Sequence, residues 1–270
     1  MGLRLAAFQG AREAALALRA GRGTYYIGGG TFLLRRVNEG DASIETLVRV
    51  ADPALAAITI TADRVTLGAS VPMAAIAVRS ELGALARAAK TIGGPAVRDM
   101  ATVGGNLFAP NPYGDLGVAL LALEAGVTIE SGAGPEEIPL ESFYARRGRL
   151  LAGSIVTAVS FARAGLSHLR FVKVSRVKPK GSAVLSIAAV VVEQGGVVSS
   201  AAIALGCMAE APMRACAAEA ALRGRALTRE GMAPALALAS EGTAPPTDAI
   251  ASAWYRRAVL AVYLGRLLGG

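Results

Sequence analysis

The segment YYIGGGTFLL, residues 25–34, joins a β-favouring run to an apolar run through three consecutive glycines. The pattern predicts a strand, a tight turn and then a helix. Glycine has no Cβ, so backbone N–H groups in such a turn can approach an anion closely, and the helix N-terminus adds partial positive charge. The segment therefore predicts a binding site for a phosphate-like group. The alternative is a plain turn in which Thr31 caps the helix.

A glycine pair lies in a second unusual segment, RDMATVGGNLFAPNPYGD, residues 98–115. It is too polar for a core segment and too irregular for a helix, so we expect a long loop, and that length itself suggests a function. Thr102 and Asn106 can offer hydrogen bonds to a second part of a long ligand. The alternatives are an ordinary surface loop and, for Asp115, the N-cap of the helix expected after it.

Few other side chains suggest chemistry. Lys173 lies between apolar residues on a predicted strand and points either outward to solvent or at an anionic or electron-rich group. The only histidine, His168, lies in a loop-like segment without a nucleophile elbow nearby. Cys207 and Cys216 make neither a disulfide framework nor a metal site. We therefore expect no catalytic side chain and no metal ligand on this chain.

Composition favours a soluble protein of the cytoplasm. The chain has 270 residues, of which 53% are hydrophobic, yet none of its apolar runs approaches the roughly 18 residues that span a bilayer. The N-terminal segment, residues 1–21, carries a charge within its apolar part, which indicates an amphipathic helix rather than a signal peptide. The net charge is +8, but the basic residues are scattered and lack interleaved aromatics. This favours an anionic cofactor or a solvated surface over nucleic acid.

The order of predicted elements indicates an α+β protein in two parts, with a boundary near residues 164–168. The first part is expected to contain a helix at 12–20, a strand at 24–27, a helix at 32–39, a helix from Ser80 to about Ile92 and a loop from residue 141 to a strand at about 154. The second part is expected to hold three antiparallel strands, with a hairpin at Gly195–Gly196, and then helices from Pro212 onward.

Taken in order, these motifs resemble the FAD-binding medium subunit of the molybdenum hydroxylases, of the carbon monoxide dehydrogenase and xanthine dehydrogenase type. That family typically reads A-G-G-T-D-L, then R-N-x-A-T-[IV]-G-G-N, then an Asp after a loop, then F-x-K-x-x-R. Here the matching positions are Gly29–Thr31, Arg98 with Ala101–Asn106, Asp115 and Lys173. The tail, PTDAIASAWYRRAVLAVYLGRLL, is similar to the family ending D-x-x-x-S-x-x-Y-R-R. The resemblance covers essentially the whole chain.

The resemblance implies a fold and a set of cofactor contacts. The fold is a two-subdomain FAD-binding domain of the PCMH type at residues 1–165, with subdomains at about 1–60 and 61–165. A small α+β C-terminal domain, with a three-stranded antiparallel sheet plus helices, follows at 166–270. The first glycine loop would hold the FAD diphosphate, and the second would lie along the ribityl–diphosphate region. The implied FAD-binding residues are Ile27, Gly28, Gly29, Gly30, Thr31, Phe32, Leu33, Ile92, Ala101, Thr102, Gly104, Gly105, Asn106, Asp115, Val156 and Lys173.

Individual roles also follow from the resemblance. Asp115 would accept hydrogen bonds from cofactor hydroxyls, and Lys173 would approach a flavin carbonyl. Ile92 would be an apolar neighbour of the cofactor, and Val156 would offer a backbone contact at the flavin edge. Phe32 stands where related oxidases carry the histidine that attaches FAD, so FAD is expected to be non-covalent.

Two departures from the pattern are visible. Phe32 replaces the usual Asp after the glycine loop, and Ser154 replaces a usual acidic residue. Neither change removes a backbone amide, so we expect FAD to bind, if more weakly.

The implied function is electron transfer within a larger enzyme. A large molybdenum-cofactor subunit and a small subunit with [2Fe-2S] clusters would be partners, in a dimer of heterotrimers, and electrons would pass through FAD to an external acceptor. The alternatives are a stand-alone FAD-dependent oxidoreductase and a non-catalytic nucleotide- or phosphate-binding module. The substrate and the acceptor, whether NAD, quinone or dioxygen, stay open.

Overall fold

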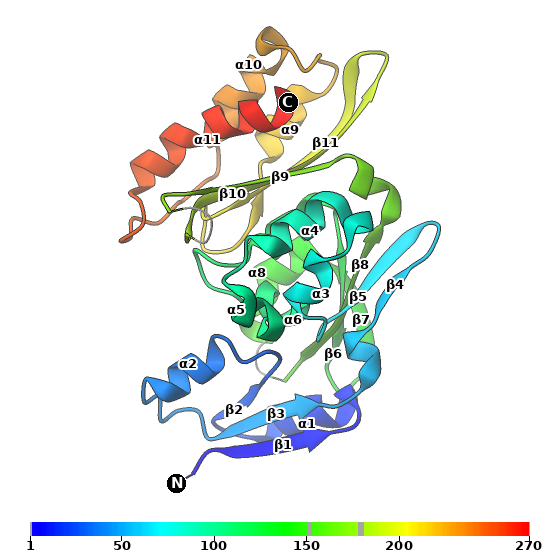
Figure 1. The fold of residues 1–270 in the computed structure, drawn as a ribbon, viewed down its shortest axis with the longest axis vertical. Coiled ribbons are helices and arrows are strands. Elements are labelled where there is room, and N and C mark those ends of the chain that lie inside the picture. Colours follow the sequence, from blue (N-terminus) through cyan, green and yellow to red (C-terminus); the bar gives the residue numbers. More distant parts are fainter. Residues whose placement is uncertain (1, 151–152, 178–180, 270) are drawn as a thin grey trace.

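Three units, each built around one sheet, are stacked along the long axis of the molecule (Figure 1). The computed structural model describes residues 2–150, 153–177 and 181–269. The three sheets have three, five and four strands. Across the described ranges, none of the helices combines the length and the apolar character needed to cross a bilayer.

The first unit is a parallel sheet with strand order β1-β3-β2. Its elements are β1 (Arg4–Phe8), α1 (Ala11–Ala20), β2 (Thr24–Tyr26), α2 (Leu33–Asn38) and β3 (Thr46–Val50). Small apolar residues of α1 pack on one face of β3, in a cluster that includes Ala14, Leu18 and Val48. The helices and the strand expected at 12–20, 24–27 and 32–39 are confirmed to within one residue at each end.

The helix expected at the very N-terminus is wrong for residues 4–8. These residues form β1, whose partners on β3 run in register from Arg4 opposite Thr46 to Phe8 opposite Val50. Pairing with a distant strand satisfies the backbone here, and no local periodicity reveals it.

The middle unit is an antiparallel sheet with strand order β4-β5-β8-β6-β7 and helices beside it. The strands are β4 (Ile58–Ile60), β5 (Arg64–Gly68), β6 (Gly126–Glu130), β7 (Pro135–Pro139) and β8 (Ile155–Ala162). The helices are α3 (Met73–Ala77), α4 (Gly83–Lys90), α5 (Pro95–Met100), α6 (Val103–Leu107), α7 (Asp115–Ala122) and α8 (Leu140–Leu150), with 3₁₀ turns at Pro53–Ala56 and Ser80–Leu82. Every residue of α7 is buried, so this helix forms the centre of the unit.

Three expectations for the middle unit need correction. The helix expected from Ser80 to about Ile92 is interrupted after the 3₁₀ turn at Ser80–Leu82, because Gly83, the first residue of α4, has a φ of 52°. The segment 98–115 is not a continuous loop, since it contains α6. The side chain of Thr102 caps this helix, which offsets the loss of helix stability caused by its two glycines. The loop expected from residue 141 is largely helix α8, which buries Phe143 in the core.

The third unit is an antiparallel sheet with strand order β12-β11-β10-β9. Its elements are β9 (Leu169–Ser175), β10 (Ala183–Gln194), β11 (Val197–Gly206), β12 (Met213–Arg214), α9 (Cys216–Leu222), α10 (Arg229–Leu238) and α11 (Ala253–Gly269), and a 3₁₀ turn at Arg163–Ser167 precedes them. Gly195 and Gly196 both have positive φ, of 61° and 80°, which confirms the expected two-residue hairpin turn. The expectation of three strands is wrong, because the two-residue β12 adds a fourth; it is too short to have a sequence pattern.

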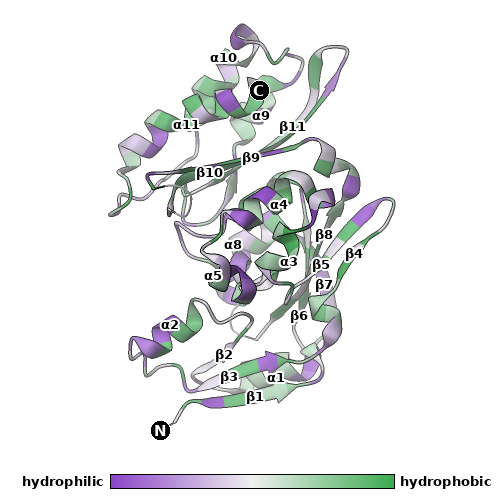
Figure 2. Ribbon diagram, in the orientation of Figure 1, coloured by the Kyte–Doolittle hydropathy of each residue, from purple (hydrophilic) through white to green (hydrophobic). Residues whose placement is uncertain are grey.

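The third sheet is buried on both faces, which explains the continuous apolar run of β10. Ile187 and Val191 pack with α9, α10 and α11, whereas Ala188 points the other way into the core of the middle unit. Figure 1 shows this sheet between the C-terminal helices and α4. In Figure 2, α11 alternates between hydrophobic and hydrophilic residues, as a helix with one face on a core requires.

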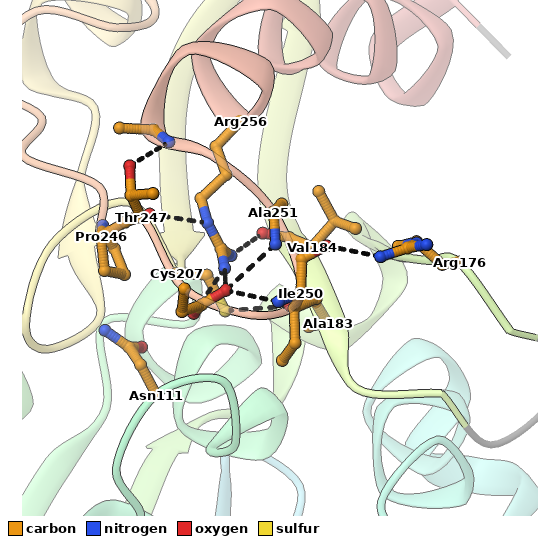
Figure 3. A network of polar contacts seen from close by, with 12 residues as sticks. Asn111, Arg176, Ala183, Val184, Cys207, Pro246, Thr247, Ile250, Ala251 and Arg256 are labelled. Carbon is orange, nitrogen blue, oxygen red and sulfur yellow. Dashed lines mark hydrogen bonds and ion pairs between the residues drawn. The ribbon is translucent and has the colours of Figure 1, made fainter.

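The tail motif is organised around Arg256, whose side chain is fully buried (Figure 3). Its guanidinium donates to both carboxylate oxygens of Asp248 at 2.8 Å and to the carbonyls of Pro246 and Val184. Asp248 in turn accepts from the backbone N–H groups of Ile250 and Ala251. The charged pair therefore joins the start of α11 to strand β10, which accounts for the Asp and Arg of the tail pattern.

Candidate functional site

The first glycine loop leaves β2 and enters α2 with its amides free. Ile27 still donates its N–H to the carbonyl of Val48 at 2.8 Å, and the N–H of Leu34 donates to the carbonyl of Gly30 at 2.9 Å. Between them, none of the six N–H groups from Gly28 to Leu33 donates a hydrogen bond to another described residue. A run of unpaired amides before a helix attracts an anion. The loop thus has the donors that a diphosphate needs.

Glycine is required in this loop because it lies directly on the second loop. A Cβ added at Gly29 would overlap the carbonyl oxygen of Met100, and one at Gly28 would lie 2.8 Å from the hydroxyl of Thr102. Gly30 has a φ of 71°, in the left-handed region that side chains disfavour. The two glycine segments are therefore in backbone contact, which the sequence predicted only as two separate parts of one ligand site.

Most N–H groups of the second glycine segment, residues 101–106, are paired inside the protein, whereas that of Thr102 donates to no other described residue. The N–H groups of Val103 and Gly104 donate to the carbonyls of Val71 and Ala69, at 3.0 and 2.8 Å. The N–H of Gly105 donates to the hydroxyl of Thr102 at 3.2 Å. These three donors are used inside the protein, so the glycines of this segment serve mainly to fix the position of the first loop.

Asn106 also serves the fold. Its side chain is buried, and its amide oxygen accepts the N–H of Gly117 at 3.2 Å. This bond joins α6 to α7, so that the second glycine segment is tied to the central helix of the middle unit.

Asp115 and Lys173 form a buried ion pair between two units. The side chains are 4% and 10% exposed, and the ammonium nitrogen lies 2.7 Å from a carboxylate oxygen. Burial raises the pKa of Asp115, while the Lys173 ammonium and the hydroxyl of Ser186 act in the opposite direction. Asp115 is the first residue of α7, where its charge suits the helix dipole, but Gly114 occupies the N-cap.

Lys173 also holds the segment that contains Ile92. Its ammonium donates to the carbonyl of Thr91 at 3.0 Å, just beyond the end of α4. The guanidinium of Arg98 donates to the carbonyls of Ile92 and Gly93, at 3.3 and 2.7 Å. The backbone around Ile92 is thereby fixed from two sides.

Val156 lies in the core of the middle unit. It is buried on β8, opposite Ile129 on β6. The structure brings together Ile27–Leu33 with Ala101–Thr102, and separately Asp115 with Lys173 and the segment beside Ile92.

Two open surface pockets of about 480 and 410 Å³ flank the first glycine loop. Both are lined by Gly29, Leu34 and Met100. Arg35 also lines the first, and Arg4 and Arg49 also line the second. Sequence reasoning did not single out Leu34, Met100 or these three arginines as neighbours of the loop. Met100 directly precedes the recognised Ala101–Asn106 segment, so its position next to the motif was the available signal.

Family comparisons cover almost the whole chain. Residues 7–163 match the FAD binding domain in molybdopterin dehydrogenase, and residues 170–269 match the CO dehydrogenase flavoprotein C-terminal domain. The chain is similar to the nicotinate dehydrogenase FAD-subunit of Eubacterium barkeri, at 34% identity over 162 residues. That match covers 57% of this chain and 55% of the relative, so it spans about half of the relative's length.

Solved structures extend the likeness to the full fold. A chain of carbon monoxide dehydrogenase from Oligotropha carboxidovorans superposes with a TM-score of 0.91 at 26% identity, covering 99% of this chain and 96% of that one. A second match is a chain of carbon monoxide dehydrogenase from Hydrogenophaga pseudoflava, in a form that lacks the Mo-pyranopterin moiety of the cofactor. It superposes with a TM-score of 0.88 at 27% identity, with the same coverage of both chains. The fold class and the family resemblance are confirmed.

The free amides beside Gly28 suit the diphosphate of a dinucleotide, and the first family match covers more than half of the chain. This chain therefore belongs to the family of FAD-binding domains in molybdopterin dehydrogenases, its cofactor is FAD, and it ends in a CO dehydrogenase flavoprotein C-terminal domain.

Proposed function

We propose that this chain is the electron-transfer flavoprotein subunit of a molybdenum-containing hydroxylase or dehydrogenase. The observation that carries the proposal is the run of six N–H groups at Gly28–Leu33 that donate to no other described residue, with Gly28 and Gly29 in contact with Thr102 and Met100. Such a run attracts the charge of a diphosphate through the backbone N–H groups themselves. The match of residues 7–163 to an FAD-binding family supports FAD as the dinucleotide.

The residues of this chain would bind and orient FAD rather than react with substrate. The amides of Gly28–Leu33 would hold the diphosphate, and Thr102 would form the opposing wall. An ammonium has three N–H donors, and that of Lys173 has two partners among the described residues, the Asp115 carboxylate and the Thr91 carbonyl. One donor is left for a cofactor oxygen. When bound, the flavin supplies the redox chemistry, so no side chain here has to act as general base.

The rest of the enzyme would lie on other chains. We propose a large partner with the molybdenum cofactor and a small partner with [2Fe-2S] clusters, assembled as a dimer of heterotrimers in the cytoplasm. Electrons would reach FAD from the iron–sulfur clusters and leave to an external acceptor. The match to a domain of molybdopterin dehydrogenases and the likeness to a nicotinate dehydrogenase FAD-subunit support this arrangement.

Non-covalent attachment of FAD is part of the proposal. Phe32 occupies the place in the glycine loop where a covalent link would need histidine, and His168 lies in the 3₁₀ turn region before β9. Denaturation of the loaded protein should therefore release all of the flavin into the supernatant.

Purification tests the proposed function. The chain is produced alone and together with the chains encoded beside it, and the visible absorbance spectrum is followed during anaerobic reduction. We expect a flavin spectrum that bleaches on reduction and a stable assembly of three chains. A folded chain that takes up no FAD would overturn the assignment. A lone chain that turns over an organic substrate would instead identify a stand-alone oxidoreductase.

A further inference from the structure

The loop between α6 and α7, residues 108–114, touches all three units of the molecule. The ring of Tyr113 packs against the ring of Phe32 in the first glycine loop, with centroids 5.2 Å apart and an interplanar angle of 50°. The side-chain amide of Asn111 donates to the carbonyls of Ala209 and Glu210 in the third unit. Figure 3 shows Asn111 directed from this loop toward the third unit. The loop therefore bridges the first glycine loop and the C-terminal domain.

The first glycine loop needs such a support. The helix that follows it, α2, has no buried residue, so it is not anchored in a core. Because the N–H groups from Gly28 to Leu33 donate to no other described residue, these amides do not hold the loop in place. Besides the contact of Gly28 and Gly29 with Thr102 and Met100, the Phe32–Tyr113 contact is a second fixed point of this loop.

We propose that Tyr113 is a positioning residue for FAD, which acts through Phe32 to hold the first glycine loop in its binding geometry. The proposal rests on the proposed function, because FAD is the ligand of that loop. Phe32 supplies the aromatic ring at the end of the glycine loop against which Tyr113 packs.

The size of the effect follows from the contact. Aromatic pairs of this geometry add a modest stabilisation beyond the area that they bury. Loss of the Tyr113 ring is therefore expected to raise the Kd for FAD by about threefold to tenfold. Tyr113→Phe keeps the ring and should bind FAD as the wild type does.

The test uses the full chain, stripped of flavin and titrated with FAD by fluorescence. The variants are Tyr113→Ala, Tyr113→Phe, Phe32→Leu and the double variant Phe32→Leu/Tyr113→Ala. Tyr255→Ala is the matched control, because both tyrosines are 43% exposed and Tyr255 lies on α11. Both single changes remove the same contact. We therefore expect the Kd of the double variant for FAD to be no higher than that of the single variant with the higher Kd.

A second readout does not need FAD. Amide hydrogen exchange of residues 27–34 in the flavin-free chain should become faster in Tyr113→Ala and stay unchanged in Tyr255→Ala. If the wild type binds no FAD but hydrogen exchange of residues 27–34 becomes faster in Tyr113→Ala, the proposed function is wrong, whereas the role of Tyr113 in supporting the loop is confirmed. If Tyr113→Ala changes neither the FAD affinity nor the exchange, or if Tyr255→Ala changes both equally, the role of Tyr113 is refuted.

Discussion

The ammonium nitrogen of Lys173 lies 2.7 Å from a carboxylate oxygen of Asp115, although the two residues belong to different units. Lys173 is on β9 of the third unit and Asp115 begins α7 of the middle unit. The same ammonium donates to the carbonyl of Thr91 at 3.0 Å. This buried pair therefore fixes the C-terminal sheet to both α7 and the end of α4.

Removing one partner of this pair should destabilise the protein strongly. Lys173→Met leaves the carboxylate of Asp115 buried without its counter-charge, which typically costs about 3–5 kcal/mol of the free energy of unfolding. Urea unfolding of the flavin-free chain measures the loss. The double variant Asp115→Leu/Lys173→Met removes both charges and should recover much of the stability. A single variant as stable as the wild type would show that the pair is not closed in solution.

Gly29 should tolerate no side chain, because the carbonyl oxygen of Met100 occupies the space that a Cβ needs. Gly29→Ala forces the two glycine segments apart and is expected to weaken FAD binding by at least about tenfold, or roughly 1.4 kcal/mol. Equilibrium titration with FAD measures this change.

Gly148→Ala is the control for that experiment, since a Cβ at Gly148 meets nothing within 4 Å and the residue lies inside α8. It should leave FAD affinity unchanged and stabilise the helix by up to about 1 kcal/mol. Equal FAD affinity in Gly29→Ala and the wild type would contradict the backbone contact.

The strand–turn–helix around the first glycine loop could be predicted because its signals are local. Three glycines follow β-favouring residues and precede an apolar run, and each signal acts over a few residues. The different chemistry of the two glycine segments could not be predicted. Whether an N–H is free depends on acceptors far away in the sequence, such as the Ala69 carbonyl that takes the N–H of Gly104. The family pattern identified both segments but did not show which one offers free N–H donors and which one supports the other.

Helix α6 shows the same limit on a smaller scale. Two glycines argue against a helix, yet Thr102 caps α6, and its own residues Val103 and Leu107 are fully buried. Tertiary burial outweighed helix propensity there. The ion pair of Asp115 with Lys173 could not be predicted either, because the sequence around one residue contains no signal for the other. Only the family pattern, which includes both residues, suggested that both lie near one ligand.

The Asp248–Arg256 pair should make stability depend on pH in the acid range. Burial acts to raise the pKa of Asp248, but the N–H groups of Ala251 and Ile250 and the Arg256 guanidinium outweigh it, so the pKa lies below its ordinary value of 3.8. A lowered carboxyl pKa contributes stability that is complete above the unfolded value and is lost as the pH falls through the folded value. The Asp248→Asn variant lacks this contribution.

The difference in unfolding free energy between the wild type and Asp248→Asn should therefore be constant above about pH 5 and shrink below about pH 4. Urea unfolding at a series of pH values measures it. Asp63→Asn is a suitable comparison, because Asp63 lies in the exposed turn between β4 and β5. A difference that grows on acidification would contradict the assigned direction of the pKa shift.

Thr102 should affect the fold through its hydroxyl alone. That oxygen accepts the N–H of Gly105 at 3.2 Å and caps α6, next to the backbone of Gly28. Thr102→Val keeps the shape but removes the cap, and is expected to cost about 0.5–2 kcal/mol of the free energy of unfolding. Thr102→Ser keeps the hydroxyl and should retain most of the stability. If urea unfolding instead finds valine as stable as threonine and serine markedly weaker, packing of the methyl group, and not the cap, holds the second glycine segment in place.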